Sequence, residues 1–164
     1  ALLTNKLNMR YGVKMETFNE RLRNDLELDE GVKYEIYLCS LGKPTFGIGH
    51  LVLPTDPESK MEIGNEVSKE RVETCFDNDI QVTIEDCKKI FSDWSGLPEE
   101  ARLVTANMCF QLGRPRLSKF KKTVSACNDH RWTDMANEMQ DSRWYRQTQN
   151  RADRLIKRIL DLEG

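Results

Sequence analysis

An apolar pattern with the spacing of an α-helix runs unbroken from Ser68 to Ile90 and sets the dimensions of the fold. Ser68 is a favourable N-cap, and Glu70 places a carboxylate in the first turn, where the helix dipole stabilises negative charge. A helix of about 20 residues is ~30 Å long, which is enough to join two lobes. We therefore predict a connecting helix over residues 68–90. Its inner face is expected to carry Val72, Cys75, Phe76, Asp79, Ile80, Thr83, Ile84, Cys87 and Ile90.

The segment before this helix combines one amphipathic helix with short β-type runs. Apolar residues recur at helical spacing over residues 17–29, with Thr17 as a fair N-cap. After Glu30 and Gly31 the pattern changes to alternating and β-friendly residues, with a turn at Leu41-Gly42-Lys43-Pro44. We predict a small antiparallel sheet whose strands lie at residues 35–38, 45–48 and 51–53.

The segment after the connecting helix contains helical patterns only. Pro98 is expected to open one helix that ends at Gly113, and Ser118 to open another. Two further helices are predicted over residues 131–140 and 149–162. The fold class is therefore α+β and mainly helical.

This pattern predicts one domain over residues 1–164, with an N-terminal arm followed by two lobes. We expect the arm at 1–16, a lobe with a three-stranded antiparallel sheet at 17–67, the connecting helix at 68–90 and a helical lobe at 91–164.

The composition excludes several classes of protein. No apolar stretch approaches the roughly 20 residues of a membrane span, and the first residues lack the apolar core of a signal peptide. The five cysteines are odd in number and lack the close pairs typical of zinc sites, so we expect reduced thiols, no metal and no cofactor. We also expect a monomer that binds neither nucleic acid nor membrane.

Charge is distributed unevenly along the chain. Residues 114–164 carry 12 basic and 7 acidic side chains, although the whole chain has a net charge of -2. This segment is a candidate face for an anionic partner, and the alternative is a solvated helical surface.

Glu30 is the best placed residue for acid catalysis. It follows an amphipathic helix and precedes a strand, so its carboxyl can project where a helix meets a sheet. Glycoside hydrolysis needs a protonated carboxyl beside the scissile oxygen, and desolvation in a cleft keeps a carboxyl protonated near neutral pH. From the residues alone, an ordinary surface pair of Asp29 and Glu30 is the competing interpretation.

Three ordered blocks of sequence favour the catalytic interpretation. The first is Leu28-Asp29-Glu30-Gly31, then Tyr37, Gly42 and Pro44-Thr45-Phe46-Gly47-Ile48-Gly49-His50-Leu51. The second is Asn107-Met108-Cys109-Phe110-Gln111-Leu112-Gly113, and the third runs from Ser142 to Ala152. Together they closely resemble the phage-type lysozymes, the muramidase family best known from the T-even bacteriophages.

This resemblance implies a two-lobed fold with the substrate between the lobes. It also implies that Glu30 is the general acid and that Thr45 positions the attacking water, with inversion at the anomeric carbon. The family's catalytic aspartate is replaced by Cys39. A free thiol is only a few per cent thiolate at neutral pH, and a neighbouring carboxylate would lower that fraction.

Three interpretations of Cys39 remain open. The thiol could serve as a weak base or nucleophile, Thr45 and water alone could sustain slower turnover, or the protein could bind glycan without cleaving it. Packing of Cys39 in the sheet overlaps the last two.

The resemblance also implies roles for residues outside the acid and the water site. Arg151 is expected to pair with Glu30, and His50 with Asp79 of the long helix. A Cys-His hydrolase built on Cys39 and His50 is disfavoured, because the sequence identifies neither an orienting group nor an oxyanion hole. Expected substrate contacts are Gly49, Phe110, Gln111, Leu112, Arg143 and Trp144, although Phe110 and Trp144 could instead be core aromatics.

The sequence thus favours an enzyme that cleaves the β-1,4 bond between N-acetylmuramic acid and N-acetylglucosamine. Its partner is bacterial peptidoglycan, reached from the host cytoplasm if the chain is a natural endolysin. The alternative is a peptidoglycan-binding protein with little turnover because of Cys39.

Overall fold

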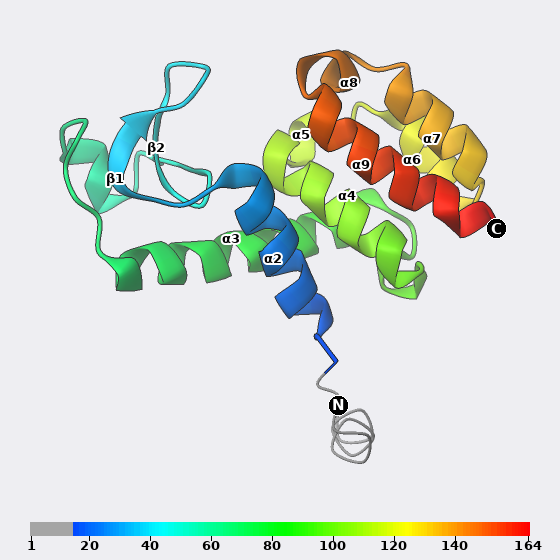
Figure 1. Cartoon of the computed structure of the whole chain (residues 1–164), viewed down its shortest axis with the longest axis horizontal. Coiled ribbons are helices and arrows are strands. Elements are labelled where there is room, and N and C mark those ends of the chain that lie inside the picture. Colours follow the sequence, from blue (N-terminus) through cyan, green and yellow to red (C-terminus); the bar gives the residue numbers. More distant parts are fainter. Residues whose placement is uncertain (1–14) are drawn as a thin grey trace.

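The structure is a computed structural model that describes residues 15–164. Except for its last two residues, the predicted N-terminal arm lies outside this range. The first described element is helix α2 (Phe18–Glu30), which begins with a capping box formed by Thr17 and Glu20. Helix α2 packs against a helix of the C-terminal lobe, α4 (Glu99–Leu112). Its position therefore places the end of α2, and Glu30 with it, between the two lobes (Figure 1).

A small antiparallel sheet forms the N-terminal lobe. Its strands are β1 (Lys33–Leu38), β2 (Pro44–Gly47) and β3 (His50–Leu51), in the spatial order β1-β2-β3. Thr45 on β2 lies opposite Tyr37 on β1, and Phe46 lies opposite His50 on β3. This pairing confirms the predicted sheet, although β3 ends two residues earlier than expected.

Helix α3 (Lys69–Ile90) is the predicted connecting helix, with Ser68 as its N-cap. It runs beneath the sheet at one end and reaches the helical lobe at the other (Figure 1). The short 3-10 turn η1 (Pro57–Lys60) precedes it and η2 (Trp94–Gly96) follows it. No helix within residues 15–164 is both long and apolar enough to cross a bilayer.

The C-terminal lobe is built around α4, which is buried along most of its length. The surrounding helices are α5 (Arg114–Leu117), α6 (Lys121–Asn128), α7 (Trp132–Gln140), α8 (Arg143–Gln147) and α9 (Gln149–Leu160), followed by the 3-10 turn η3 (Asp161–Glu163). Together these elements confirm the α+β, mainly helical class.

One predicted helix start is wrong. Ser118 does not cap a helix that follows it; it ends α5, and its hydroxyl donates to the carbonyl oxygen of Arg114 at 2.7 Å. The next helix, α6, begins at Lys121. A serine hydroxyl can satisfy backbone groups at either end of a helix, so the residue type alone did not decide between them.

Candidate active site

Glu30 is the last residue of α2, and its carboxyl reaches across to α9. The chain leaves the helix through Gly31, whose φ of 72° lies in the left-handed region that glycine adopts without a steric penalty. Glu30 Oε1 accepts a hydrogen bond from Arg151 Nη1 at 2.7 Å. The Glu30 side chain keeps 20% of its surface exposed, so the acid remains accessible.

A buried polar network behind Glu30 fixes the position of Arg151. Arg151 Nε donates to Asn107 Oδ1 at 2.9 Å, and Asn107 Nδ2 donates to Asp29 Oδ2 at 2.9 Å. Asp29 also pairs with Arg154, and its side chain is only 2% exposed. Because every member contacts the next, Arg151 is held in one orientation toward Glu30.

Gly49 lies close to the Glu30 carboxyl, on the side of Oε2. A Cβ atom built on Gly49 would lie 2.8 Å from Glu30 Oε2, closer than real Cβ contacts allow. The residue also has a φ of 64°. Glycine is therefore required here by both the backbone and the close approach of the carboxyl.

Cys39 and Thr45 meet at the turn between β1 and β2. The carbonyl oxygen of Lys43 accepts from the Cys39 backbone N–H at 2.9 Å and from the Thr45 hydroxyl at 2.9 Å. Thr45 is buried, whereas Cys39 is partly exposed. The turn thus presents a thiol to solvent directly beside a fixed hydroxyl.

The environment of Cys39 favours its thiolate, contrary to the expectation from sequence. Hydrogen bonds from the backbones of Lys43 and Leu41 lower the pKa of this thiol, and the Thr45 hydroxyl and the charge of Lys43 act in the same direction. Burial alone raises the pKa of the thiol, and it is outweighed because backbone N–H donors stabilise the anion directly.

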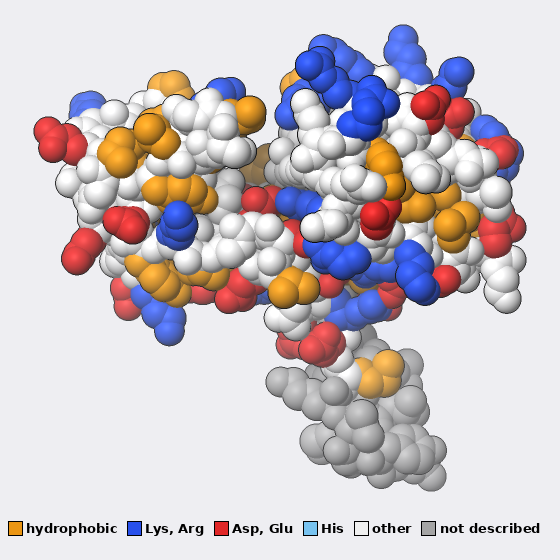
Figure 2. Space-filling model, turned by 45° about the horizontal axis from the view of Figure 1, so that its top comes forward, with side chains coloured by type: hydrophobic (Ala, Val, Ile, Leu, Met, Phe, Trp, Pro, Cys, Tyr) orange, Lys and Arg blue, Asp and Glu red, His pale blue; other side chains and the backbone are white. Residues whose placement is uncertain are grey.

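Tyr37 connects the two sides of this site. Burial raises the pKa of the Tyr37 phenol, and the negative charges of Glu30 and Cys39 raise it further. Glu30 and Cys39 therefore both lie close enough to Tyr37 to act on its phenol. The surface is hollowed between the lobes, with acidic and basic side chains on the floor of the hollow (Figure 2). A carboxyl together with a thiol and a hydroxyl can supply the groups that hydrolysis requires.

Comparison with known proteins shows the family of the chain. The model of the phage lysozyme family matches residues 27–160. The chain belongs to the phage lysozyme family.

The chain has relatives in Dictyostelium discoideum and in phages. It is 31% identical to probable T4-type lysozyme 2 of Dictyostelium discoideum, over 82% of this chain and 91% of that protein. It is 28% identical to the pre-baseplate central spike protein of Enterobacteria phage T4, over 87% of this chain but only 28% of the spike protein. It is 27% identical to a peptidoglycan hydrolase of Pseudomonas phage phiKMV, over 90% of this chain and 16% of that protein.

The residues expected to contact substrate differ in their exposure in this phage lysozyme. Trp144 is only 2% exposed, so its ring cannot offer a face to a sugar. Its indole Nε1 instead donates to Gln111 Oε1 at 2.8 Å, which fixes the Gln111 side chain. Leu112 is buried, and Phe110 is partly buried with its ring at 90° to that of Phe76.

Arg143 is the exposed member of this group. It is the first residue of α8, directly before the buried Trp144. Gln111 and Arg143 are therefore the polar groups of the expected set that remain available on the helical lobe.

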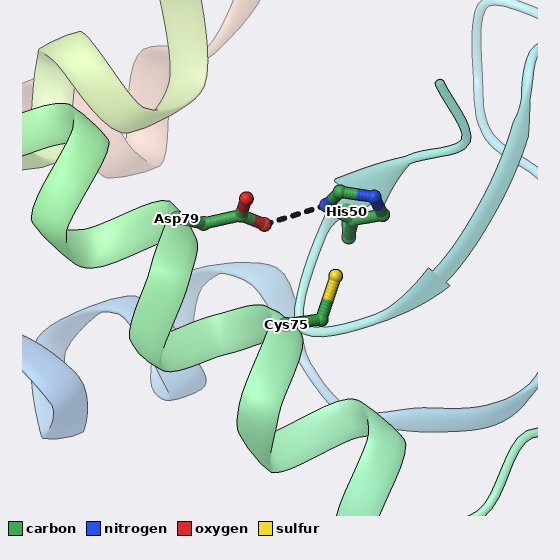
Figure 3. Close-up of side chains that lie close together, drawn as sticks. All are labelled: His50, Cys75 and Asp79. Atoms are coloured by element: carbon green, nitrogen blue, oxygen red, sulfur yellow. Dashed lines mark hydrogen bonds and ion pairs between the residues drawn. The ribbon is translucent and has the colours of Figure 1, made fainter. Parts of the chain in front are cut away.

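His50 lies between two carboxylates rather than one. Its Nδ1 is 2.7 Å from Asp79 Oδ2, and its Nε2 is 2.7 Å from Asp56 Oδ2. Burial by itself lowers the pKa of His50, but hydrogen bonds with Asp79, Cys75 and Asp56 outweigh it and raise the pKa to about 11. Asp79 and Cys75 both project from α3 toward the imidazole of β3 (Figure 3). His50 therefore joins the sheet to the connecting helix.

Sequence reasoning assigned no site role to Tyr37, Asp56 and Asn107, although Tyr37 and Asn107 lie in the blocks that resemble the family. Asn107 carried a usable signal, because it is an amide side chain within a helix segment that is otherwise mostly apolar. No sequence signal pointed to Asp56, because only the folded loop brings its carboxylate to Nε2 of His50.

Proposed function

We propose that this phage lysozyme hydrolyses the β-1,4 bond between N-acetylmuramic acid and N-acetylglucosamine in bacterial peptidoglycan. The observation that carries the proposal is the fixed Glu30 carboxyl, with Arg151 on one oxygen and Gly49 against the other. The T4-type lysozyme and peptidoglycan hydrolase relatives support the same substrate.

In this mechanism Glu30 is the general acid. Its proton passes to the glycosidic oxygen as the bond from that oxygen to the anomeric carbon breaks. The bound sugar excludes water from the space around this carboxyl. After turnover, Arg151 stabilises the carboxylate that results.

Thr45 and Cys39 act on the attacking water. The Thr45 hydroxyl is held near the Cys39 sulfur and orients water toward the anomeric carbon from the face opposite to the leaving group. The Cys39 thiolate accepts the proton that this water loses. The product has inverted configuration, since no bond forms between the protein and the sugar.

The decisive test is Glu30→Gln, assayed by lysis of peptidoglycan suspensions. An amide cannot donate the proton to the leaving oxygen, so we expect the rate to fall by at least about 100-fold with the fold intact. Glu27→Gln is the matched control, because Glu27 is an exposed carboxylate on the same helix. Lysis by the Glu30 variant within about twofold of the parent would contradict the assignment.

A peptidoglycan-binding protein with little turnover is the second candidate, favoured by the thiol that stands in place of the family aspartate. Release of reducing sugar and retention on insoluble peptidoglycan separate the two. Retention without release by the parent protein identifies the binder; release identifies the enzyme.

A further inference from the structure

Three side chains with metal-binding atoms converge between β3 and α3, away from Glu30. They are His50, Cys75 and Asp79, and their ligand atoms all lie within 4.8 Å of one another. His50 and Cys75 are buried, and Asp79 is mostly shielded. Figure 3 shows the Cys75 sulfur and the Asp79 carboxylate directed toward the same side of the imidazole.

The backbone already provides the spacing that such a site requires. Cys75 and Asp79 are separated by four residues on α3, so they lie on the same face of the helix. His50 is held opposite them by the pairing of β3 with β2. Imidazole, thiolate and carboxylate together form a donor set suited to Zn²⁺.

The outer side of His50 provides an independent observation that points to a metal. A metal-bound histidine usually donates its other ring N–H to a carboxylate, which fixes the ring and makes the bound nitrogen more basic. Here Asp56 Oδ2 is 2.7 Å from Nε2, and the Leu53 backbone N–H donates to the same carboxylate oxygen at 2.8 Å. The imidazole is therefore already oriented with Nδ1 toward Cys75 and Asp79.

We propose that His50 Nδ1, Cys75 Sγ and an Asp79 oxygen bind one Zn²⁺ ion and thereby cross-link the sheet to the connecting helix. A water molecule completes the tetrahedron. Binding releases two protons to solvent, one from the charged His50 imidazole and one from the neutral Cys75 thiol, and the divalent ion brings in the same charge that these two protons carry away. The net charge of the buried cluster is unchanged, so no new uncompensated charge is created.

The nitrogen and oxygen ligands require only a small adjustment, and the Cys75 sulfur lies within 4.8 Å of both. The Nδ1 to Oδ2 distance is 2.7 Å, whereas two ligands at about 2.0–2.1 Å in a tetrahedral site are ~3.3 Å apart. A rotation of the Asp79 carboxylate can supply this difference. The site is independent of the glycosidase proposal, because none of its ligands touches Glu30.

The test replaces zinc by Co²⁺, whose bond to a thiolate gives a strong near-ultraviolet charge-transfer band. The full chain is treated with a chelator, freed of it and titrated with Co²⁺ and then with Zn²⁺. We expect a band that saturates at one ion per chain and is displaced by Zn²⁺. Cys75→Ser should remove the band, whereas Cys39→Ser, which deletes the exposed thiol, should leave it.

Thermal unfolding provides the second readout and does not require the variants to be as stable as the parent. Zn²⁺ at a free concentration of about 100 times Kd should raise Tm of the parent by ~5–10 °C. The shift should vanish in Cys75→Ser and in Cys75→Val, which keeps an apolar side chain at this position. Asp56→Asn should weaken binding about 10–100-fold.

The proposal is overturned if the parent gives no charge-transfer band, if the band survives in Cys75→Ser and disappears in Cys39→Ser, or if Zn²⁺ lowers Tm. Any of these outcomes would mean that the cluster does not hold Zn²⁺ and that His50 serves only in the contacts with Asp56 and Asp79.

Discussion

At the scale of single residues, the acid and the water site are held by backbone and by buried polar groups rather than by flexible surface chains. Arg151 donates to one oxygen of Glu30, and the other oxygen occupies the space that a side chain at position 49 would need. The carbonyl oxygen of Lys43 holds both Cys39 and Thr45. Such fixed groups lower the cost of reorganisation during the reaction, so small changes at these positions should have large effects on rate.

Cys39 gives the most informative comparison. If its thiolate accepts the proton of the attacking water, Cys39→Ser should lose at least about tenfold in lytic rate, because a serine hydroxyl is not ionised at neutral pH. Cys39→Asp should match or exceed the parent, since a carboxylate stabilises the developing positive charge on the sugar.

Alkylation with iodoacetamide checks the same point in the parent. The rate should fall in proportion to modification of Cys39, because the thiol pKa is lowered and the other four cysteines are buried. A Cys39→Ser variant as fast as the parent would remove the thiol from the mechanism and leave Thr45 as the group that holds the water.

Gly49→Ala tests the close contact with the acid. The added Cβ would meet Glu30 Oε2 at 2.8 Å, so we expect lysis to fall by about tenfold or more. Gly64→Ala is the matched control, because Gly64 also has a positive φ but has nothing within 4 Å of an added Cβ. Both variants should lose about 1–2 kcal/mol of stability from backbone strain, and only Gly49→Ala should lose the corresponding activity.

At the scale of elements, the connection between the sheet and α3 depends on polar contacts. His50 pairs with Asp79 on α3 and with Asp56, and Arg71 on α3 contacts both Asp56 and the buried Glu58. Hydrogen bonds from Arg71 lower the pKa of Glu58, and contacts with His50 lower that of Asp56 against the effect of burial. The loop that contains η1 is thereby fixed to both elements.

The pH dependence of stability should reveal the His50 contacts in metal-free protein. The pKa of His50 is about 11 when folded and about 6.5 when unfolded, so its contribution is complete below pH ~6.5 and decreases as pH rises toward 11. The lowered pKa of Asp56 works in the opposite direction, and its contribution is lost in acid. Cys75 and Arg71 are the other polar groups that face this cluster.

Urea unfolding of the parent and of His50→Asn at several pH values checks this prediction. The stability difference should be about 2–3 kcal/mol near pH 6 and should shrink steadily toward pH 10. A difference that stays constant across this range would show that the imidazole is not charged in the folded protein.

At the scale of the whole molecule, the uneven charge along the chain is largely used internally. Arginines of α9 pair with carboxylates of the acidic first part of the chain. Arg151 pairs with Glu30, Arg154 with Asp29, and Arg158 with both Asp25 and Glu100. These contacts tie α2 to α4 and α9. The basic character of α9 thus serves the fold, whereas the exposed Arg143 and Arg146 of α8 remain free to contact an anionic partner.

Arg158→Met should separate stability from catalysis. Methionine preserves length and apolar contacts but removes two partly buried ion pairs, so we expect a loss of about 1–2 kcal/mol and a Tm lower by ~3–6 °C. The lytic rate at 25 °C should be unchanged. Lys157→Met is the matched control, because its pair with Asp161 is highly exposed and should contribute less than about 0.5 kcal/mol. Equal Tm values for the two variants would contradict this view.

Much of the fold could be predicted from the sequence. Helical spacing identified α3, and the capping residues Thr17 and Ser68 located the starts of α2 and α3. These features are local, because periodicity and capping depend on residues a few positions apart. The resemblance of three short blocks to the phage lysozymes likewise pointed to the family that the comparison over residues 27–160 shows.

Only the tertiary structure decided which distant side chains meet. The pairing of Asp56 with His50, the burial of the Trp144 ring, and the chain of hydrogen bonds through Asn107 all join separate elements. The lowered pKa of Cys39 likewise depends on a folded turn that aims backbone donors at sulfur. Electrostatic shifts and burial arise from the three-dimensional surroundings of a group, which residue type and spacing do not specify.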